Sequence, residues 1–197
     1  MRTRELLIGL CLMMISVAST SQAQSRSGIG YGIGHSATPA QIKAWDTDVA
    51  PDGKNLPAGR DTVAQGKLIY AAQCAACHGE QGQGGLGDKL VGGRGTLATP
   101  APVKTVGSFW PYATTLFDYV RRAMPLNAPQ SLSDAEVYAV SGYVLHLNGL
   151  LNEDAVVDAK TLTELKMPNR NGFISDPRPD VHSVACLREC PSGAAAP

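Results

Sequence analysis

The chain has 197 residues, among them 17 Lys and Arg, 17 Asp and Glu, and five cysteines. This balance argues against nucleic acid as a partner, because binding a polyanion needs an excess of clustered cations. No segment after residue 23 has the length and apolar character of a membrane span, so we expect no stable membrane insertion.

Residues 1–23 have the pattern of a secretory signal peptide. Arg2 and Arg4 precede an apolar run from Leu6 to Val17, and small residues end at Ala23. We expect cleavage after Ala23 and export to the periplasm, which would also remove Cys11. A lipoprotein interpretation of Cys11 is weaker, because the bulky Leu10 precedes it.

Residues 24–59 form a predicted N-terminal arm. It is rich in turn residues, with one short helix capped at Thr38-Pro39. Tyr31 and Trp45 favour an arm that lies on a partner protein over a disordered tail.

The stretch "DTVAQGKLIYAAQC" predicts an amphipathic helix that ends at Cys74, with apolar positions at Val63, Leu68, Ile69 and Ala72. Gly66 and Tyr70 lie on one face of it, which we expect to pack against the last helix of the domain.

The motif "QCAACHG" follows, with Cys74, Cys77 and His78 in Cys-x-x-Cys-His order. This is the attachment signal for one c-type haem, in which the two thiols bind the vinyl groups and the histidine ligates the iron. A disulfide or redox thiol pair is the main alternative, since exported cysteines are usually paired. A zinc site formed with the second cysteine pair would leave His78 unexplained.

The glycine-rich run after His78 is predicted to wrap one haem edge, because it lacks the strand and the Gly-Lys-Ser/Thr of a phosphate loop. Leu90 and Val91 would contact the ring. Arg94 pairs with a haem propionate or is plain surface charge. Trp110 lines the crevice or packs in the core.

Two Met-Pro pairs offer a second iron ligand. Met124 ends the predicted helix "TTLFDYVRRAMP" and is our candidate, because a rigid loop between two helices can hold a thioether in place. Met167 lies in a Pro- and Asn-rich stretch, and the alternative for it is a packing role. His146 and His182 are weaker candidates.

The stretch "SLSDAEVYAVSGYVLHLNG" predicts the last helix of the domain. Ser133 and Glu136 form a capping box, and Gly149 follows the end. Its apolar stripe should cross the Gly66 and Tyr70 face; the stripe consists of Val137, Val140, Val144 and Leu147. These limits place the haem domain at residues 60–150.

Residues 151–197 form a predicted C-terminal arm with Phe173 and Ile174 as candidate anchors. Cys186 and Cys190 favour a disulfide over free thiols in an oxidising compartment. Their spacing requires a turn rather than a regular helix.

From about residue 29 to 190 the chain resembles the cytochrome c subunits of Sox-pathway sulfur (sulfite/sulfane) dehydrogenases, the SoxD family. The resemblance rests on "GIGHSATPAQIKAWDTDVAPDGKNLPAG", "QCAACHGEQGQG", "TVGSFWPYATTLFDYVRRAMPLNAPQSLSDAEVYAV" and "MPNRNGF". The predicted fold is all-α: a class I cytochrome c-type haem domain with extended, mostly irregular N- and C-terminal arms. Some family members carry a second haem domain, whereas this chain has one Cys-x-x-Cys-His.

The resemblance implies a periplasmic complex with a molybdenum-cofactor subunit that oxidises sulfite or carrier-bound sulfur. In it Cys74 and Cys77 would bind haem, His78 would be the proximal ligand and Met124 the distal one. The chain would pass single electrons to a soluble cytochrome c and would not be catalytic alone. The alternatives are the cytochrome of another periplasmic dehydrogenase, or a haem enzyme acting on thiosulfate or peroxide.

Overall fold

The computed structural model describes residues 34–178, and it divides between Ala44 and Trp45 into two units. The N-terminal unit contains α2 (Pro39–Trp45), whose last residue opens the larger unit. Thr38 caps α2 as expected, since its hydroxyl accepts from the Gln41 amide at 3.3 Å. The signal peptide, Tyr31, His182 and the Cys186/Cys190 pair lie outside the described residues.

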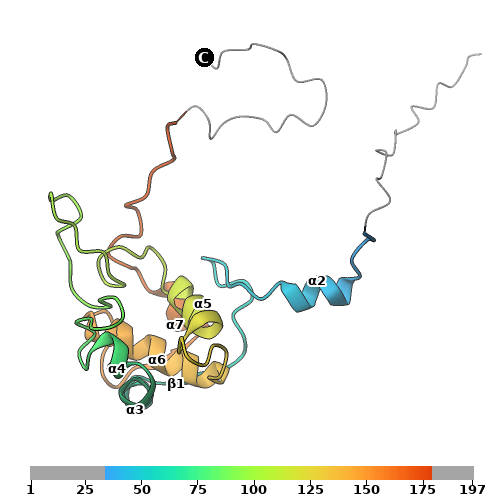
Figure 1. The fold of residues 1–197 in the computed structure, drawn as a ribbon, viewed down its shortest axis with the longest axis horizontal. Helices are drawn as coiled ribbons and strands as arrows, with labels where there is room; N and C mark the ends of the chain where they lie inside the picture. The colour runs from blue at the N-terminus through green and yellow to red at the C-terminus, as the bar shows by residue number, and fades with distance from the viewer. Residues whose placement is uncertain (1–33, 179–197) are drawn as a thin grey trace, which may run out of the picture. The chain divides into compact units, whose positions relative to one another are not determined.

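The larger unit, the body of the molecule, is organised by the crossing of α3 (Val63–Gln73) and α6 (Asp134–Leu147). Figure 1 shows α3 nearly end-on against α6. A Cβ on Gly66 would lie 1.9 Å from the Ala139 carbonyl oxygen, so only glycine permits this approach. Tyr70 packs on Tyr143 with ring centroids 5.3 Å apart. The predicted packing of the Gly66 and Tyr70 face against the last helix is confirmed.

One detail of the predicted α3 face is wrong. Leu68 is 64% exposed and Ala72 is exposed, whereas the buried residues are Val63, Gly66, Ile69 and Tyr70. At 100° per residue, Leu68 lies about 200° around the helix from Gly66. Leu68 therefore lies on the solvent side of α3, although it is adjacent in sequence to the buried Ile69.

The helix α6 is buried over most of its length, from Val137 to Leu145. It begins at the predicted capping box, in which the Ser133 amide donates to Glu136 Oε2 at 2.8 Å. The helix α5 (Ala113–Ala123) packs beside it and buries Leu116 and Phe117.

A short two-stranded antiparallel sheet joins segments far apart in the chain. The strand β1 (Arg60–Thr62) pairs with β2 (Val156–Asp158), with Asp61 opposite Val157. The helix α7 (Ala159–Glu164) follows, capped by Asp158, and buries Leu162. The body thus includes residues beyond 150, the predicted end of the haem domain, since Val157, Leu162 and Met167 belong to the same core.

Within the body, the segment from Trp45 to Gly59 lies against α5 and α6, and we call it the strap; the sequence predicted it as part of an arm that lies on a partner protein. The buried Val49 amide donates to the Asp118 carboxylate on α5 at 2.9 Å. The Tyr138 hydroxyl donates to the Pro57 carbonyl at 2.8 Å, and Thr114 bonds the Pro51 carbonyl. The body gains apolar burial in this way, because Val49 and Leu56 join its core, and a small domain has little core to spare.

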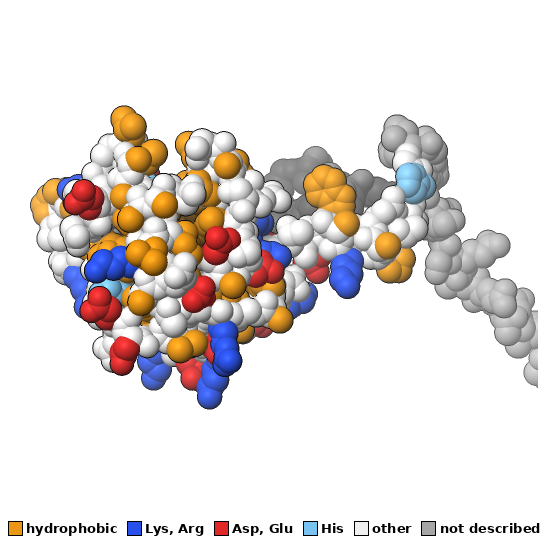
Figure 2. Space-filling model, turned by 90° about the horizontal axis from the view of Figure 1, so that it is seen from below, with side chains coloured by type: hydrophobic (Ala, Val, Ile, Leu, Met, Phe, Trp, Pro, Cys, Tyr) orange, Lys and Arg blue, Asp and Glu red, His pale blue; other side chains and the backbone are white. Residues whose placement is uncertain are grey.

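The surface of the body carries orange apolar side chains among the charged ones in Figure 2. Trp45, Ile174, Phe173, Leu86 and Leu126 are among the large apolar residues left exposed. No helix within residues 34–178 has the length and apolar character to cross a membrane.

Candidate functional site

The helix α4 (Ala75–His78) is a single turn that carries the predicted site residues. Cys74 ends α3 and also caps α4, and its carbonyl accepts from the amides of Cys77 at 3.1 Å and His78 at 3.0 Å. Both cysteines are free thiols, Cys74 half-buried and Cys77 exposed. The three-residue spacing places both thiols on one side of the turn.

The glycine-rich loop after His78 folds back over α4. The Gly84 amide donates to the His78 carbonyl, and the Gly87 amide donates to the Cys77 carbonyl, both at 2.8 Å. A Cβ on Gly85 would lie 2.9 Å from the Cys77 carbonyl oxygen. The glycines allow backbone to approach backbone here, which agrees with a wrapping loop.

One contact orients the His78 ring. Its Nδ1 lies 2.7 Å from the Asp88 carbonyl oxygen. A carbonyl only accepts, so Nδ1 is the donor in this contact, and Nε2 is the ring nitrogen left to bind a metal. A metal-ligating histidine is typically held in this way.

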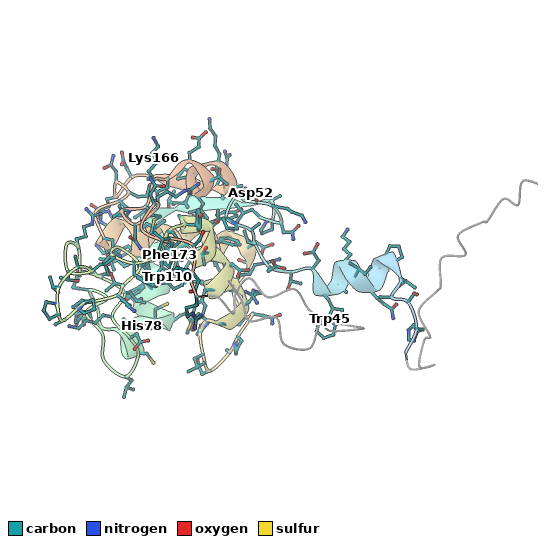
Figure 3. The ribbon with its side chains drawn as sticks, turned by 90° about the horizontal axis from the view of Figure 1, so that it is seen from above. Trp45, Asp52, His78, Trp110, Lys166 and Phe173 are labelled. Carbon is teal, nitrogen blue, oxygen red and sulfur yellow. The ribbon has the colours of Figure 1, made fainter. Side chains whose placement is uncertain are left out.

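Gly87 packs directly against the His78 imidazole, where there is no space for a side chain. A Cβ at this position would lie 2.8 Å from Cε1 and 3.0 Å from Nδ1 of His78. The loop therefore lies against the imidazole, and Asp88 is placed beside Nδ1. His78 is labelled in Figure 3.

Tyr70 joins α3 to the end of α4. Its hydroxyl donates to the Gly79 carbonyl at 2.8 Å, and burial, followed by the nearby Cys74, raises the pKa of Tyr70 to about 12. Burial and the nearby Cys77 raise the pKa of Cys74 to about 11. Both groups are neutral at physiological pH, and the Cys74 thiol is not an activated thiolate.

Met124 caps the C-terminus of α5, with its amide bonded to the Val120 carbonyl at 3.1 Å. It is half-buried, and Pro125 after it is buried. Met124 thus lies at the end of α5, as predicted. Met167, in contrast, is 2% exposed within the hydrophobic core, as its packing interpretation expects.

Asn148, at the C-cap of α6, holds the loop that follows Asp88. Its side-chain amide donates to the carbonyls of Leu90 at 3.1 Å and Val144 at 2.9 Å. Arg94 donates to the Asn148 carbonyl at 2.9 Å, so its guanidinium takes part in this junction.

The remaining predicted residues have packing partners. Trp110 is half-buried and meets Tyr119 edge to face, with centroids 5.9 Å apart. Leu90 packs against the core. His146 Nδ1 lies 3.0 Å from the Leu151 carbonyl oxygen, and its ring stacks with Tyr143.

Sequence reasoning missed Asp88, Gly87 and Asn148 as parts of the site. Asp88 acts through its main-chain carbonyl and Gly87 through the absence of a side chain, so neither has a residue-type signal. The Asn-Gly pair at residues 148–149 was interpreted only as a helix end.

These residues fit a covalently bound haem. Two free thiols lie one turn apart, the adjacent imidazole uses Nδ1 in a hydrogen bond and keeps Nε2 for a metal, and the glycine-rich loop lies along the imidazole. Cys74, Cys77 and His78 could therefore hold the group, with the thiols as tethers and the histidine as an iron ligand. Met124 is the candidate for the second iron ligand.

Comparisons with known proteins agree with this geometry. Residues 61–144 match the family model described as cytochrome C oxidase, cbb3-type, subunit III. The chain also matches the crystal structure of the sulfane dehydrogenase SoxCD from Paracoccus pantotrophus. That match has 40% identity and a TM-score of 0.70, and it covers 84% of this chain and 85% of the other. This chain belongs to the c-type cytochromes.

Two curated relatives of this cytochrome are thiosulfate dehydrogenases. The one from Stutzerimonas stutzeri is 34% identical over 113 residues, which is 51% of this chain and 35% of the relative. The one from Allochromatium vinosum is 37% identical over 83 residues, which is 41% of this chain and 29% of the relative. The cytochrome spans about a third of the length of these relatives.

The fold is that of a class I cytochrome c, mostly helical, and such a domain carries haem c. The cytochrome is therefore an electron-transfer protein related to components of sulfur dehydrogenases.

Proposed function

We propose that the chain is the periplasmic electron-transfer subunit of a sulfur-oxidising dehydrogenase. It would take electrons from a molybdenum-cofactor subunit that oxidises sulfite or sulfane sulfur, and deliver them to a soluble cytochrome c. The observation that carries this proposal is the match to SoxCD over 84% of the chain. The cytochrome family model covers only residues 61–144, so the likeness extends into the flanking segments.

In this proposal one haem c is bound, with Cys74 and Cys77 as its thioether tethers. The haem would supply one-electron redox chemistry when bound. His78 would ligate the iron through Nε2, because Asp88 holds the proton on Nδ1. Met124 would complete the ligand set from the end of α5, which leaves no position for a substrate and raises the reduction potential.

The ligand assignment is tested by two matched variants of the haem-loaded protein. Met124→Leu should abolish the methionine-to-iron absorption band and lower the reduction potential. Met167→Leu, a volume-conserving change in the core, should retain both. Loss of the band in the Met167 variant alone would overturn the assignment.

The partner is tested by purification from the native periplasm. The chain should co-purify with a protein that contains molybdenum, and sulfite or a persulfide substrate should reduce its haem only when that protein is present. Reduction of the isolated cytochrome by the substrate would contradict a carrier role.

The two thiosulfate dehydrogenase relatives favour a second candidate, a haem enzyme that oxidises thiosulfate. It predicts that the isolated chain couples thiosulfate oxidation to ferricyanide reduction. The carrier proposal predicts no such turnover, so one assay on the purified protein distinguishes the two.

A further inference from the structure

Charge is distributed unevenly along the described part of the chain. Residues 89–117 and 165–175 contain five cations and no Asp or Glu, whereas the other described residues contain eight cations and 14 carboxylates. The first group therefore carries a formal charge of about +5 and the second about −6, although the whole chain is neutral.

The two acid-free segments pack against each other. Asn169 donates its side-chain amide to the Phe109 carbonyl at 2.7 Å, and Phe173 meets Phe109 with centroids 5.2 Å apart. Arg94 and Leu97 of the first segment line one shallow hollow together with Pro168 and Asn169 of the second.

Four of the five cations gather at this junction. Lys104 lies over the Phe109 ring, 5.0 Å from its centroid, and Arg170 lies 4.4 Å from the centroid of Tyr112. Lys166 and Arg170 line the same hollow along residues 163–172, together with Glu164, whose carboxylate lies 4.0 Å from Lys160. We call these four residues, Arg94, Lys104, Lys166 and Arg170, the cationic face.

The cationic face is accessible. All four side chains are exposed, and none takes part in a salt bridge among the described residues. Arg121, Arg122, Lys67 and Lys160, in contrast, each pair with a carboxylate. Phe173 is 54% and Ile174 89% exposed beside the cations; Lys166 and Phe173 are labelled in Figure 3.

We propose that the cationic face docks on a carboxylate-rich surface of the dehydrogenase subunit that reduces this cytochrome. Exposed arginine and aromatic side chains are typical of protein interfaces, and a local excess of cations attracts an acidic partner over a Debye length. A small anion would not use the exposed Phe173 and Ile174. The inference rests on the proposed function for the identity of the partner. Arg94 and Lys104 lie within the residues that match the cytochrome family model, and Lys166 and Arg170 lie outside them, so the face spans the haem domain and the segment that follows it.

The test compares two double variants of the haem-loaded chain. Lys104→Gln/Lys166→Gln removes two charges from the cationic face. Arg60→Gln/Lys67→Gln removes two from β1 and α3 and serves as the control with the same net charge. Binding to the co-purified molybdenum protein is measured by calorimetry between 20 and 300 mM salt. The face variant should bind about fivefold weaker or more, with a smaller salt dependence, and the control should bind like the wild type.

Carbodiimide cross-linking of the native complex provides a second measurement. It joins lysine amines directly to carboxylates, so mass spectrometry should find Lys104 or Lys166 linked to Asp or Glu of the partner. Links through Lys67 or Lys160 alone would overturn the proposal. So would equal binding by both variants, or a face variant that loses only self-association or binding to phosphatidylglycerol vesicles.

The docking proposal and the proposed function are contradicted by different results. Electron transfer that is equal in both variants ends the docking proposal and leaves the function. A partner that binds through the cationic face but passes no electrons from any sulfur substrate ends the function and leaves the docking.

Discussion

At the scale of single residues, the contact between Gly87 and His78 controls the candidate ligand. A Cβ at Gly87 would lie 2.8–3.3 Å from the imidazole atoms Cε1, Nδ1 and Nε2. A side chain there must displace the ring or the loop that carries the Asp88 carbonyl. Ligand orientation and metal properties depend on such contacts.

We therefore expect Gly87→Ala to shift the reduction potential of the haem-loaded protein and to change its visible spectrum, measured by spectroelectrochemistry. Gly92→Ala is the control, since its Cβ meets nothing within 4 Å, although its positive φ adds about 1 kcal/mol of strain. Equal shifts in both variants would mean that loop strain, and not the imidazole contact, is responsible.

Buried hydroxyls provide a second prediction at this scale. Among the described residues, Ser141 Oγ on α6 is buried without a hydrogen-bond partner. Ser108 Oγ, also buried, accepts from the Thr105 amide at 2.9 Å and donates to the Val103 carbonyl at 2.7 Å. A buried polar group without a partner costs about 1–3 kcal/mol.

Ser141→Ala should therefore leave the free energy of unfolding unchanged or raise it, because Ala is also the better helix former. Ser108→Ala should lower it by about 1–3 kcal/mol, since it leaves two main-chain groups unsatisfied. Urea denaturation of the haem-loaded protein measures both. A comparable loss in the two variants would mean that Ser141 has a partner of its own.

At the scale of secondary-structure elements, the crossing of α3 and α6 depends on Gly66. The Cβ of an alanine would lie 1.9 Å from main-chain oxygen, which cannot move without shifting a helix. Gly142 on α6 is the matched control, because its Cβ would meet the Val157 side chain, which can rotate.

Gly66→Ala should lower the free energy of unfolding by about 3 kcal/mol or more, in spite of the better helix propensity of alanine. Gly142→Ala should lower it less. Both values come from denaturant titration monitored by far-ultraviolet circular dichroism. A Gly66 variant as stable as the wild type would contradict the close crossing.

The capping box of α6 makes stability depend on pH. Hydrogen bonds from the Ser133 hydroxyl and amide lower the pKa of Glu136. A lowered folded-state pKa stabilises the protein above the unfolded value of about 4.3, and this contribution is lost as pH falls through the folded pKa. The effect is below about 1 kcal/mol, because water screens this carboxylate.

Glu136→Gln should therefore be less stable than the wild type at pH 7 and nearly equal to it at pH 3, measured by thermal unfolding. Glu80→Gln, an exposed carboxylate that caps no helix, should show no such difference. A Glu136 variant whose deficit persists at pH 3 would show that the carboxylate charge is not the cause.

The elements that the sequence predicted are those with local signals. The capping box at Ser133, the helix end at Met124-Pro125 and the Gly66/Tyr70 face are all confirmed. The pairing of β1 with β2 was not predicted, because each strand has three residues and its partner lies far along the chain. The buried bond from Val49 to Asp118 likewise joins residues that no local pattern connects.

At the scale of the whole molecule, the division between Ala44 and Trp45 separates residues that contribute to the hydrophobic core of the body from residues that do not. The strap from Trp45 to Gly59 contributes Val49 and Leu56 to the core and bonds both Asp118 and Tyr138. None of the residues of α2 is buried. The N-terminal flank, predicted as a single arm, therefore has two parts with different roles.

Two deletions that keep residues 1–23 in place test this division. Removing residues 24–44 should leave the thermal unfolding midpoint of the haem-loaded protein within a few degrees of the wild type. Removing residues 24–59 takes Val49 and Leu56 out of the core and deprives the Tyr138 hydroxyl and the Asp118 carboxylate of their partners in the strap, which together should cost several kcal/mol. Calorimetry measures both midpoints, and the midpoint of the longer deletion should be lower by about 10 °C or more. Equal midpoints would mean that the strap is not part of the cooperative unit, because a segment whose loss leaves unfolding unchanged contributes nothing to it.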